Sequence, residues 1–362
     1  MLELLTLKPD TFGLDISDLS FKIVKLVRKG KFLRLSFFLE ERIKPGLIKE
    51  GEIRNEDELA FKIRAALQRH KREAPRTKYV VASLPEEKAF LQVIQMPKMP
   101  EEDLKSAVIY EAENYIPLPI EEVYFDSVIV KPLVDHLDHF DVLIAALPKK
   151  TVNSYLNCLK KAGLFPQVFE IESLAIARAL VKKGISPVPL LLIDFGATRT
   201  SFIIFSGYSL KFTSSIPVSS QSITDAIAKN LNISQKDAEK LKIKEGLDSK
   251  RIFEAAIPVL TDLSEQIKKH LDYYTSHVFH EHLDSNKKNV SKIILSGGGA
   301  NLKGLTGFFS DRFKIPVEIG NPWVNILPEP LKEIPELPYS ESLKYTTALG
   351  LALRGIENNF YD

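Results

Sequence analysis

Two aspartates occupy matching places in the chain, and each could help to hold a metal ion beside a phosphate group. Asp15 lies in Gly13-Leu14-Asp15-Ile16-Ser17, and Asp194 lies in Leu192-Ile193-Asp194-Phe195-Gly196. Each aspartate ends a predicted strand just before a tight turn into a second strand. The N–H groups of such a turn can face an anion, while the carboxylate holds magnesium, often through water. A single aspartate here would more simply form an Asx-turn, but the repetition favours a shared phosphate and magnesium site.

Three consecutive glycines form a second candidate binding element. Gly297, Gly298 and Gly299 follow an apolar strand-like run and precede a predicted helix. Glycines allow a ligand to approach the backbone, and a helix N-terminus favours anions. The dinucleotide-binding pattern is excluded because Leu302 stands where its third glycine belongs, and the P-loop is excluded because Leu305 replaces its lysine. A plain strand-to-helix turn remains the alternative.

A third candidate is the pair Glu239 and Lys242 on a predicted helix. The two residues are three positions apart, so they share one face of that helix. On these grounds alone, a surface ion pair is the simpler interpretation.

The elements that must position these residues follow from hydrophobic periodicity and turn residues. Strands are predicted at 12–16, 21–27, 32–39, 79–84, 89–95, 124–131, 140–147, 190–194, 201–205, 209–213 and 291–296. Helices are predicted at 56–71, 100–115, 222–231, 234–244, 249–282, 302–313 and 345–357. The pattern of the first three strands restarts at Leu190. This restart indicates a duplicated α/β fold with a cleft between its two halves.

Composition limits the classes of protein to consider. The chain has 362 residues, of which 44% are hydrophobic and 27% charged, with a net charge of +2, as in an ordinary globular protein. The near balance of charge gives no reason to expect nucleic acid as a partner. No apolar run is long enough to span a bilayer, and the N-terminus does not resemble a secretion signal. We therefore expect a cytoplasmic protein that reaches a membrane only through a partner.

Taken in order, the motifs resemble the type IV pilus assembly protein PilM family, which belongs to the actin/Hsp70/hexokinase superfamily and is related to FtsA. The resemblance covers nearly the whole chain. The stretches that carry it are Phe12 to Ile16 with Lys22, Glu113 to Pro117, Ala145 to Lys149, Ile171 to Ser173, Ile193 to Thr198, Ala238-Glu239 with Lys242, Leu295 to Leu305, and Gly320 to Pro322.

The resemblance implies an actin-like duplicated fold with ribonuclease H-like halves and a nucleotide cleft. The halves would be 1–188, with a small subdomain inserted at about 45–140, and 189–362, with a small helical subdomain at about 222–290. ATP and Mg²⁺ would occupy the cleft, with Asp15 and Asp194 on the metal side and in contact with the ion through water. The implied ATP-binding residues are Asp15, Ser17, Lys22, Asp194, Gly196, Ala197, Thr198, Glu239, Lys242, Gly297, Gly298 and Gly299.

The resemblance also implies a role and a partner. Proteins of this family are cytoplasmic scaffolds of the inner-membrane complex that assembles type IV pili. They bind the short cytoplasmic N-terminal tail of a PilN-like membrane protein. We therefore expect this chain to lie at the inner face of the cell membrane, held there by such a tail. The peptide groove would lie between the core of the first half and the inserted subdomain, and the helix from Pro100 to Tyr115 is the element to probe.

Three departures from the family pattern bear on hydrolysis. Ser17 and Asp18 stand where the family has Gly and Ser, and an extra carboxylate near phosphate would repel it. Ser219 and Ser220 replace a Gly-Gly pair. Lys150 stands where an acid often follows the connecting segment, at a position we interpret as facing the attacking water. These changes predict at most slow hydrolysis.

Two alternative functions belong to the same superfamily. A small-molecule kinase would need a general base and a polar substrate pocket, and no signature of either stands out. An FtsA-like division tether would need a C-terminal basic amphipathic helix, whereas this chain ends in the acidic stretch 357–362. The pilus-assembly scaffold is therefore the leading interpretation.

Overall fold

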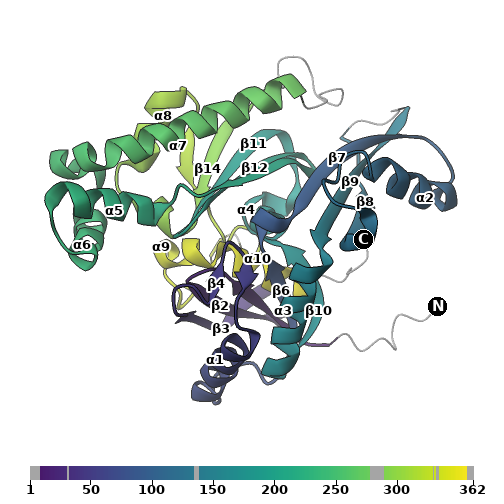
Figure 1. The fold of residues 1–362 in the computed structure, drawn as a ribbon, viewed down its shortest axis with the longest axis horizontal. Helices are drawn as coiled ribbons and strands as arrows, with labels where there is room; N and C mark the ends of the chain where they lie inside the picture. Colours follow the sequence, from purple (N-terminus) through teal and green to yellow (C-terminus); the bar gives the residue numbers. More distant parts are fainter. Residues whose placement is uncertain are drawn as a thin grey trace.

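Two five-stranded sheets form the framework of the computed structural model (Figure 1). The structure describes residues 9–30, 32–133, 138–277, 289–328, 330–331 and 334–356, and only the backbone of Glu101 and His277. The first sheet has the strand order β10-β6-β1-β2-β3 and the second β13-β12-β11-β14-β15.

The two sheets share one topology. The strands of the first are β1 (Thr11–Ile16), β2 (Ser20–Lys29), β3 (Phe32–Arg42), β6 (Tyr79–Leu84) and β10 (Phe165–Ile171). Those of the second are β11 (Ser186–Phe195), β12 (Thr200–Gly207), β13 (Ser209–Ile216), β14 (Lys292–Ser296) and β15 (Val317–Ile319). In each, the first strand pairs antiparallel with the second and parallel with the fourth. The predicted duplication is therefore confirmed.

The first sheet is covered by helices on both faces. One face buries an apolar core with α1 (Glu56–Arg69) and α3 (Lys149–Ala162), where Cys158 is fully buried. The other face carries α4 (Glu172–Leu180) and α10 (Thr346–Ile356). Helix α10 thus packs on the first sheet although it lies in the predicted range 189–362, and the division into two halves remains a prediction.

The second sheet buries the largest core cluster against helices α5 (Ser220–Leu231), α7 (Lys250–His277) and α8 (Leu305–Phe313). Helix α6 (Gln235–Glu245) joins the same cluster through Ala238. The helices α5, α6 and α7 extend to the left in Figure 1, within the range expected for the small helical subdomain. Its boundaries remain a prediction.

A separate three-stranded sheet overlaps the range expected for the inserted subdomain, about 45–140, but its strand β9 extends beyond the end of that range. It has the order β7-β9-β8, from β7 (Phe90–Pro97), β8 (Val123–Ile129) and β9 (His139–Pro148), and it packs against α2 (Glu101–Ala112). The hairpin of β4 (Ile48–Lys49) and β5 (Glu52–Ile53) instead packs with the first sheet, through Ile48. The predicted boundary at about 45 is therefore upstream of this sheet, which begins at Phe90.

Local sequence explains where several helices begin. Asn55 caps α1 by accepting a hydrogen bond from the N–H of Glu58, and Ser234 caps α6 through the N–H of Asp237. Ser219 and Ser222 form a reciprocal capping box at α5. Within the described residues, no helix combines the length and apolar character needed to cross a membrane.

Candidate functional site

A cleft of about 380 Å³ is lined by residues of both halves. Every residue predicted to bind ATP lines this cleft except Lys242. The walls come from the turns that follow β1 and β11, from the triple-glycine turn after β14, from α6, and from the segment that leads into α10. The cleft therefore brings together motifs that lie far apart in the sequence.

Asp15 and Asp194 are held in equivalent ways. The fully buried hydroxyl of Ser83 on β6 donates to Asp15 Oδ1 over 3.3 Å, and that of Ser296 on β14 donates to Asp194 Oδ1 over 3.0 Å. Each serine lies on the parallel neighbour of the aspartate's strand. Lys22, which pairs with Asp15 across the first hairpin, places Nζ 3.4 Å from Asp15 Oδ2. The duplication thus reaches the side chains that orient the two carboxylates.

The carboxylates in the cleft disfavour one another's charge. Burial raises the pKa of Asp194 to about 6, and the nearby charge of Asp15 adds to the rise. Burial, followed by repulsion from Asp15 and Glu87, raises the pKa of Glu172 well above its usual range. Glu172 is the first residue of α4 and lines the cleft. A divalent cation among these groups would relieve the repulsion.

The three positions of the triple glycine differ in whether protein packing requires a glycine there. A Cβ on Gly297 would lie 2.6 Å from the carbonyl oxygen of Phe195, and one on Gly299 would lie 2.6 Å from its ring atom Cδ1. Both positions therefore require glycine for the triple-glycine turn to pack on the end of β11. A Cβ on Gly298 would meet only Lys344 Cβ, at 3.8 Å. Gly298 therefore leaves open space in the cleft that protein packing does not demand.

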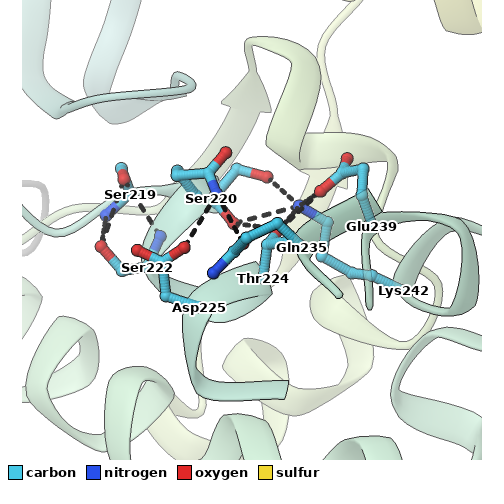
Figure 2. A network of polar contacts seen from close by, with 9 residues as sticks. Ser219, Ser220, Ser222, Thr224, Asp225, Gln235, Glu239 and Lys242 are labelled. Atoms are coloured by element: carbon cyan, nitrogen blue, oxygen red, sulfur yellow. Dashed lines mark hydrogen bonds and ion pairs between the residues drawn. The ribbon is translucent and has the colours of Figure 1, made fainter. Parts of the chain in front are cut away.

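The N-terminus of α5 supports the turn between β11 and β12, residues 196–199. This turn is called the second phosphate turn, after its predicted role. The backbone N–H of Ser220 donates to Gly196 O over 3.0 Å, and that of Gln221 to Ala197 O over 3.2 Å. The hydroxyls of Ser219 and Ser220 also have defined contacts, one in the capping box and the other with Lys242 (Figure 2). The serines that replace Gly-Gly therefore stabilise this end of the helix.

Lys242 lies behind the cleft wall. Its Nζ donates to Ser220 Oγ (2.8 Å) and Thr224 Oγ1 (2.7 Å), and lies 2.8 Å from Glu239 Oε2 (Figure 2). The residue is 5% exposed, and burial lowers its pKa. Glu239 itself lines the cleft. Lys242 therefore holds Glu239 and α5 in place, and direct contact with a ligand is not the role this geometry favours.

Asp18 lines the cleft, so its repulsion of a phosphate stays a prediction, but the structure shows how its carboxylate is held. Its carboxylate accepts hydrogen bonds of 3.2 Å from the backbone N–H groups of Glu50 and Gly51, the two turn residues of the β4–β5 hairpin. Two amide donors stabilise the negative charge. Asp18 therefore fastens the hairpin to the turn between β1 and β2, residues 17–19, called the first phosphate turn after its predicted role. The two N–H groups partly compensate the charge of Asp18.

The interpretation of Lys150 is wrong. The residue is exposed in the first turn of α3, and it is not among the residues that line the cleft. Helix α3 packs on the first sheet through Val152 and Tyr155, which directs Lys150 to the surface. The strand-to-helix junction Ile171-Glu172-Ser173 instead contributes an acid, Glu172, to the lining of the cleft.

Sequence reasoning missed several residues of the site. Ser83, Glu87, Arg199 and Lys344 are brought to the cleft, or to its aspartates, by strand pairing and by contact between the halves. No local pattern marks them. The repeat itself offered one signal, because Ser296 precedes the triple glycine and Ser83 stands at the end of the equivalent strand.

The geometry suits magnesium bound largely through water. Among the described residues, no three His, Cys, Asp or Glu side chains converge closely enough to hold a metal directly. Two carboxylates from facing turns match the preference of Mg²⁺ for a few protein oxygens and several waters. A second depression, of about 460 Å³, lies between α7 and α8, but no residue predicted to bind ATP lines it.

A family model described as type IV pilus assembly protein PilM matches residues 13–356. The chain belongs to the PilM family. The solved structure of a PilM–PilN type IV pilus biogenesis complex contains a chain that is 29% identical, with a TM-score of 0.79. The similarity covers 97% of this PilM-family chain and 99% of that chain. This is therefore a type IV pilus assembly protein of actin-like fold.

More distant relatives support the same fold. Cell division protein FtsA of Borreliella burgdorferi is 24% identical over 70% of this chain and 66% of its own length. FtsA of Pseudomonas aeruginosa is 23% identical over 55% and 50%. The chain thus spans between half and two thirds of these curated relatives. MreB5 of Spiroplasma citri, solved with bound ADP, has a TM-score of 0.56 at 14% identity, covering 96% of this chain and 98% of that one.

Proposed function

We propose that this PilM-family protein binds ATP and Mg²⁺ in the cleft and, as a cytoplasmic scaffold of type IV pilus assembly, binds the N-terminal tail of a PilN-like inner-membrane protein. The observation that carries the nucleotide part is the convergence of Asp15, Asp194 and the triple-glycine turn on one cleft. The crystal structure of MreB5 bound to ADP, a protein of similar fold, supports this assignment.

Particular residues would hold each part of the nucleotide. The turns after Asp15 and Asp194 would present backbone N–H groups to the phosphates, and the two carboxylates would orient waters of the magnesium ion. Bound Mg²⁺ would supply positive charge beside the phosphates. Gly298 would leave room for the nucleoside, and Glu239 would accept hydrogen bonds from its sugar.

Hydrolysis should be slow or absent. Glu172 lines the cleft, and burial, together with the nearby charges of Asp15 and Glu87, raises its pKa well above the usual range and so disfavours its charged form in the free protein. Only the charged carboxylate can accept a proton from water, and this environment disfavours it. We expect turnover below about 1 per second, which is slower than most enzymes.

The inserted subdomain offers a surface suited to an extended peptide. Helix α2 exposes Ile109 and Tyr110, and β8, which ends its sheet among the described strands, exposes Val128 and Ile129. A peptide can gain affinity from backbone hydrogen bonds to a strand edge and specificity from apolar contacts. Binding to a membrane protein's tail would place this protein at the inner face of the cell membrane.

Fluorescence anisotropy with labelled N-terminal peptides of PilN-like proteins tests the partner. We expect saturable binding that Tyr110→Ala and Val128→Asp weaken, while Ile243→Ala, an exposed apolar change on α6, leaves it unchanged. If no peptide binds, and the full-length membrane partner also fails to recruit the protein to vesicles, the scaffold proposal fails.

A further inference from the structure

Arg199 and Glu87 form an ion pair across the cleft. Arg199 closes the second phosphate turn, where its carbonyl oxygen accepts a 2.9 Å hydrogen bond from the N–H of Gly196. Glu87 belongs to the short helix η2 (Glu86–Lys88), which follows β6 of the first half. Arg199 Nε lies 3.8 Å from Glu87 Oε1, and both side chains are mostly buried.

The distance from Arg199 to Glu87 is longer than the hydrogen bond that Arg199 makes to Ser215. Arg199 Nε donates to Ser215 Oγ over 2.9 Å, which anchors the side chain to β13. At 3.8 Å the contact with Glu87 is an ion pair without a good hydrogen bond, since a strong N–H···O⁻ contact spans about 2.7–2.9 Å. The guanidinium therefore retains donors that a better anion could accept.

Glu87 is a poor partner for holding this cation. Burial raises the pKa of its carboxyl, and the nearby charge of Asp18 raises it further. A Cβ added to Gly51 would lie 3.1 Å from Glu87 Oε1, so the side chain is also confined. A phosphate carries more charge than this carboxylate and offers oxygens that an arginine can bind in a bidentate manner.

The pair lies away from the part of the cleft suited to a nucleoside. Glu239, which would face the sugar, contacts Thr224 and Lys242, whereas Glu87 neighbours Gly51 and Asp18 beside the first phosphate turn. A nucleotide with its sugar at Glu239 and its phosphates between the two turns would direct its last phosphate toward the Arg199–Glu87 pair.

We propose that Arg199 exchanges Glu87 for the terminal phosphate of ATP and so makes the cleft selective for a nucleoside triphosphate over a diphosphate. This inference rests on the proposed nucleotide binding. The exchange breaks an ion pair between the halves only when the third phosphate is present, so the contact between η2 and the second phosphate turn reports which nucleotide is bound.

Two substitutions with opposite expected effects test the exchange. Arg199→Gln should weaken ATP binding by about 10- to 100-fold, the loss of one hydrogen bond between charged groups, and leave ADP binding within about twofold. Glu87→Gln should strengthen ATP binding by a few fold, because the arginine no longer has a competing carboxylate. Both variants break the same ion pair, so a purely structural role predicts effects in the same direction.

The dissociation constants of Mg-ATP and Mg-ADP should be measured by titration calorimetry for each folded variant. Arg251→Gln is the matched control, because Arg251 pairs with Glu245 outside the cleft. An ATP-to-ADP preference that Arg199→Gln leaves unchanged, or that both variants shift alike, overturns this inference alone. Failure of the wild-type protein to bind either nucleotide overturns the proposed function as well.

Discussion

At the residue scale, Asp194 combines a cost to stability with the ability to hold a cation. Its pKa is raised to about 6, chiefly by burial, so ionisation disfavours the folded state. Well below pH 4 the carboxyl is protonated in both states and no penalty exists. The penalty grows as pH rises from about 4 to about 6, and it is complete above that range.

Asp194→Asn should therefore stabilise the nucleotide-free protein at pH 7.5. The expected gain is about 1–2 kcal/mol, less than the whole pKa shift implies, because the side chain is partly open to the cleft. The gain should vanish near pH 4, and magnesium-dependent ATP binding should be lost. Denaturant titrations at several pH values measure the first effect. A gain of equal size at pH 4 and pH 7.5 would show that the carboxyl charge is not its cause.

The triple glycine provides a second test at this scale. Substitution of one glycine should weaken ATP binding, whereas substitution of its neighbour should lower stability. Gly298→Ala should fold normally and bind ATP about fivefold or more weakly, since its Cβ enters the open cleft. Gly299→Ala should lose about 1–3 kcal/mol of stability, since its Cβ would collide with Phe195. Thermal melts with nucleotide titrations separate the two. Equal destabilisation by both substitutions would contradict the assignment of Gly298 to the ligand.

The sequence alone indicated the site residues that lie in local patterns. It missed the residues that reach the site only through contacts between distant segments. Asp15 and Asp194 are recognisable because each ends an apolar run before a turn. Arg199 and Glu87 meet only because the two halves face each other. The role first given to Lys150 failed because α3 turns that residue to the surface, which no local pattern reveals.

At the element scale, the β4–β5 hairpin is tied to the first phosphate turn by one side chain. Glu50 and Gly51 have φ of 51° and 72°, so the turn has the left-handed geometry of a two-residue hairpin. Asp18 accepts both of their N–H groups, and the hydroxyl of Tyr155 donates to the carbonyl oxygen of Gly51 over 3.0 Å. The hairpin thereby fixes the turn on which phosphate binding would depend.

Asp18→Ala should cost about 1–3 kcal/mol of stability, because two amide donors lose a charged acceptor. It should also weaken ATP binding, whereas simple repulsion by Asp18 would predict stronger binding. Urea denaturation and a fluorescent ATP analogue give the two readouts. Asp225→Ala is the control, because the exposed carboxylate of Asp225 on α5 accepts a hydrogen bond from the side chain of Gln221. Tighter ATP binding by a stable Asp18→Ala protein would support the repulsion hypothesis instead.

The elements themselves were largely predictable, and their packing was not. Strand 79–84 was predicted with the bounds of β6, and the helix expected at 56–71 is α1 (Glu56–Arg69). Such elements follow from periodicity and capping, which are local. The pairing of β7 with β9 and the return of α10 to the first sheet depend on contacts between distant segments.

At the scale of the whole molecule, the inserted sheet touches the second half as well as the first. Lys211 on β13 places Nζ 3.0 Å from Asp141 Oδ2 on β9, and both side chains are nearly buried. Lys131 also lies over the ring of Tyr208, 5.1 Å from its centroid. The subdomain proposed to bind the peptide is therefore in contact with the half that carries Asp194.

Lys211→Met should destabilise the protein by about 1–3 kcal/mol, because Asp141 would lose its lysine partner at a nearly buried site. Lys292→Met provides the contrast, since Lys292 pairs with Glu318 on the exposed edge of the same half and should change stability by less than about 0.5 kcal/mol. Chemical denaturation measures both. Similar losses for the two variants would argue against a specific contact between β9 and β13.

The most direct measurement is calorimetric titration of ATP into the wild-type protein with Mg²⁺ and, separately, with EDTA. We predict saturable binding of one nucleotide per chain, weakened at least about tenfold without the metal or in Asp194→Ala. Binding that is equal in EDTA would remove the two aspartates from the metal site. No detectable heat at millimolar Mg-ATP with folded protein, supported by an unchanged melting temperature, would contradict the central claim that this cleft binds ATP.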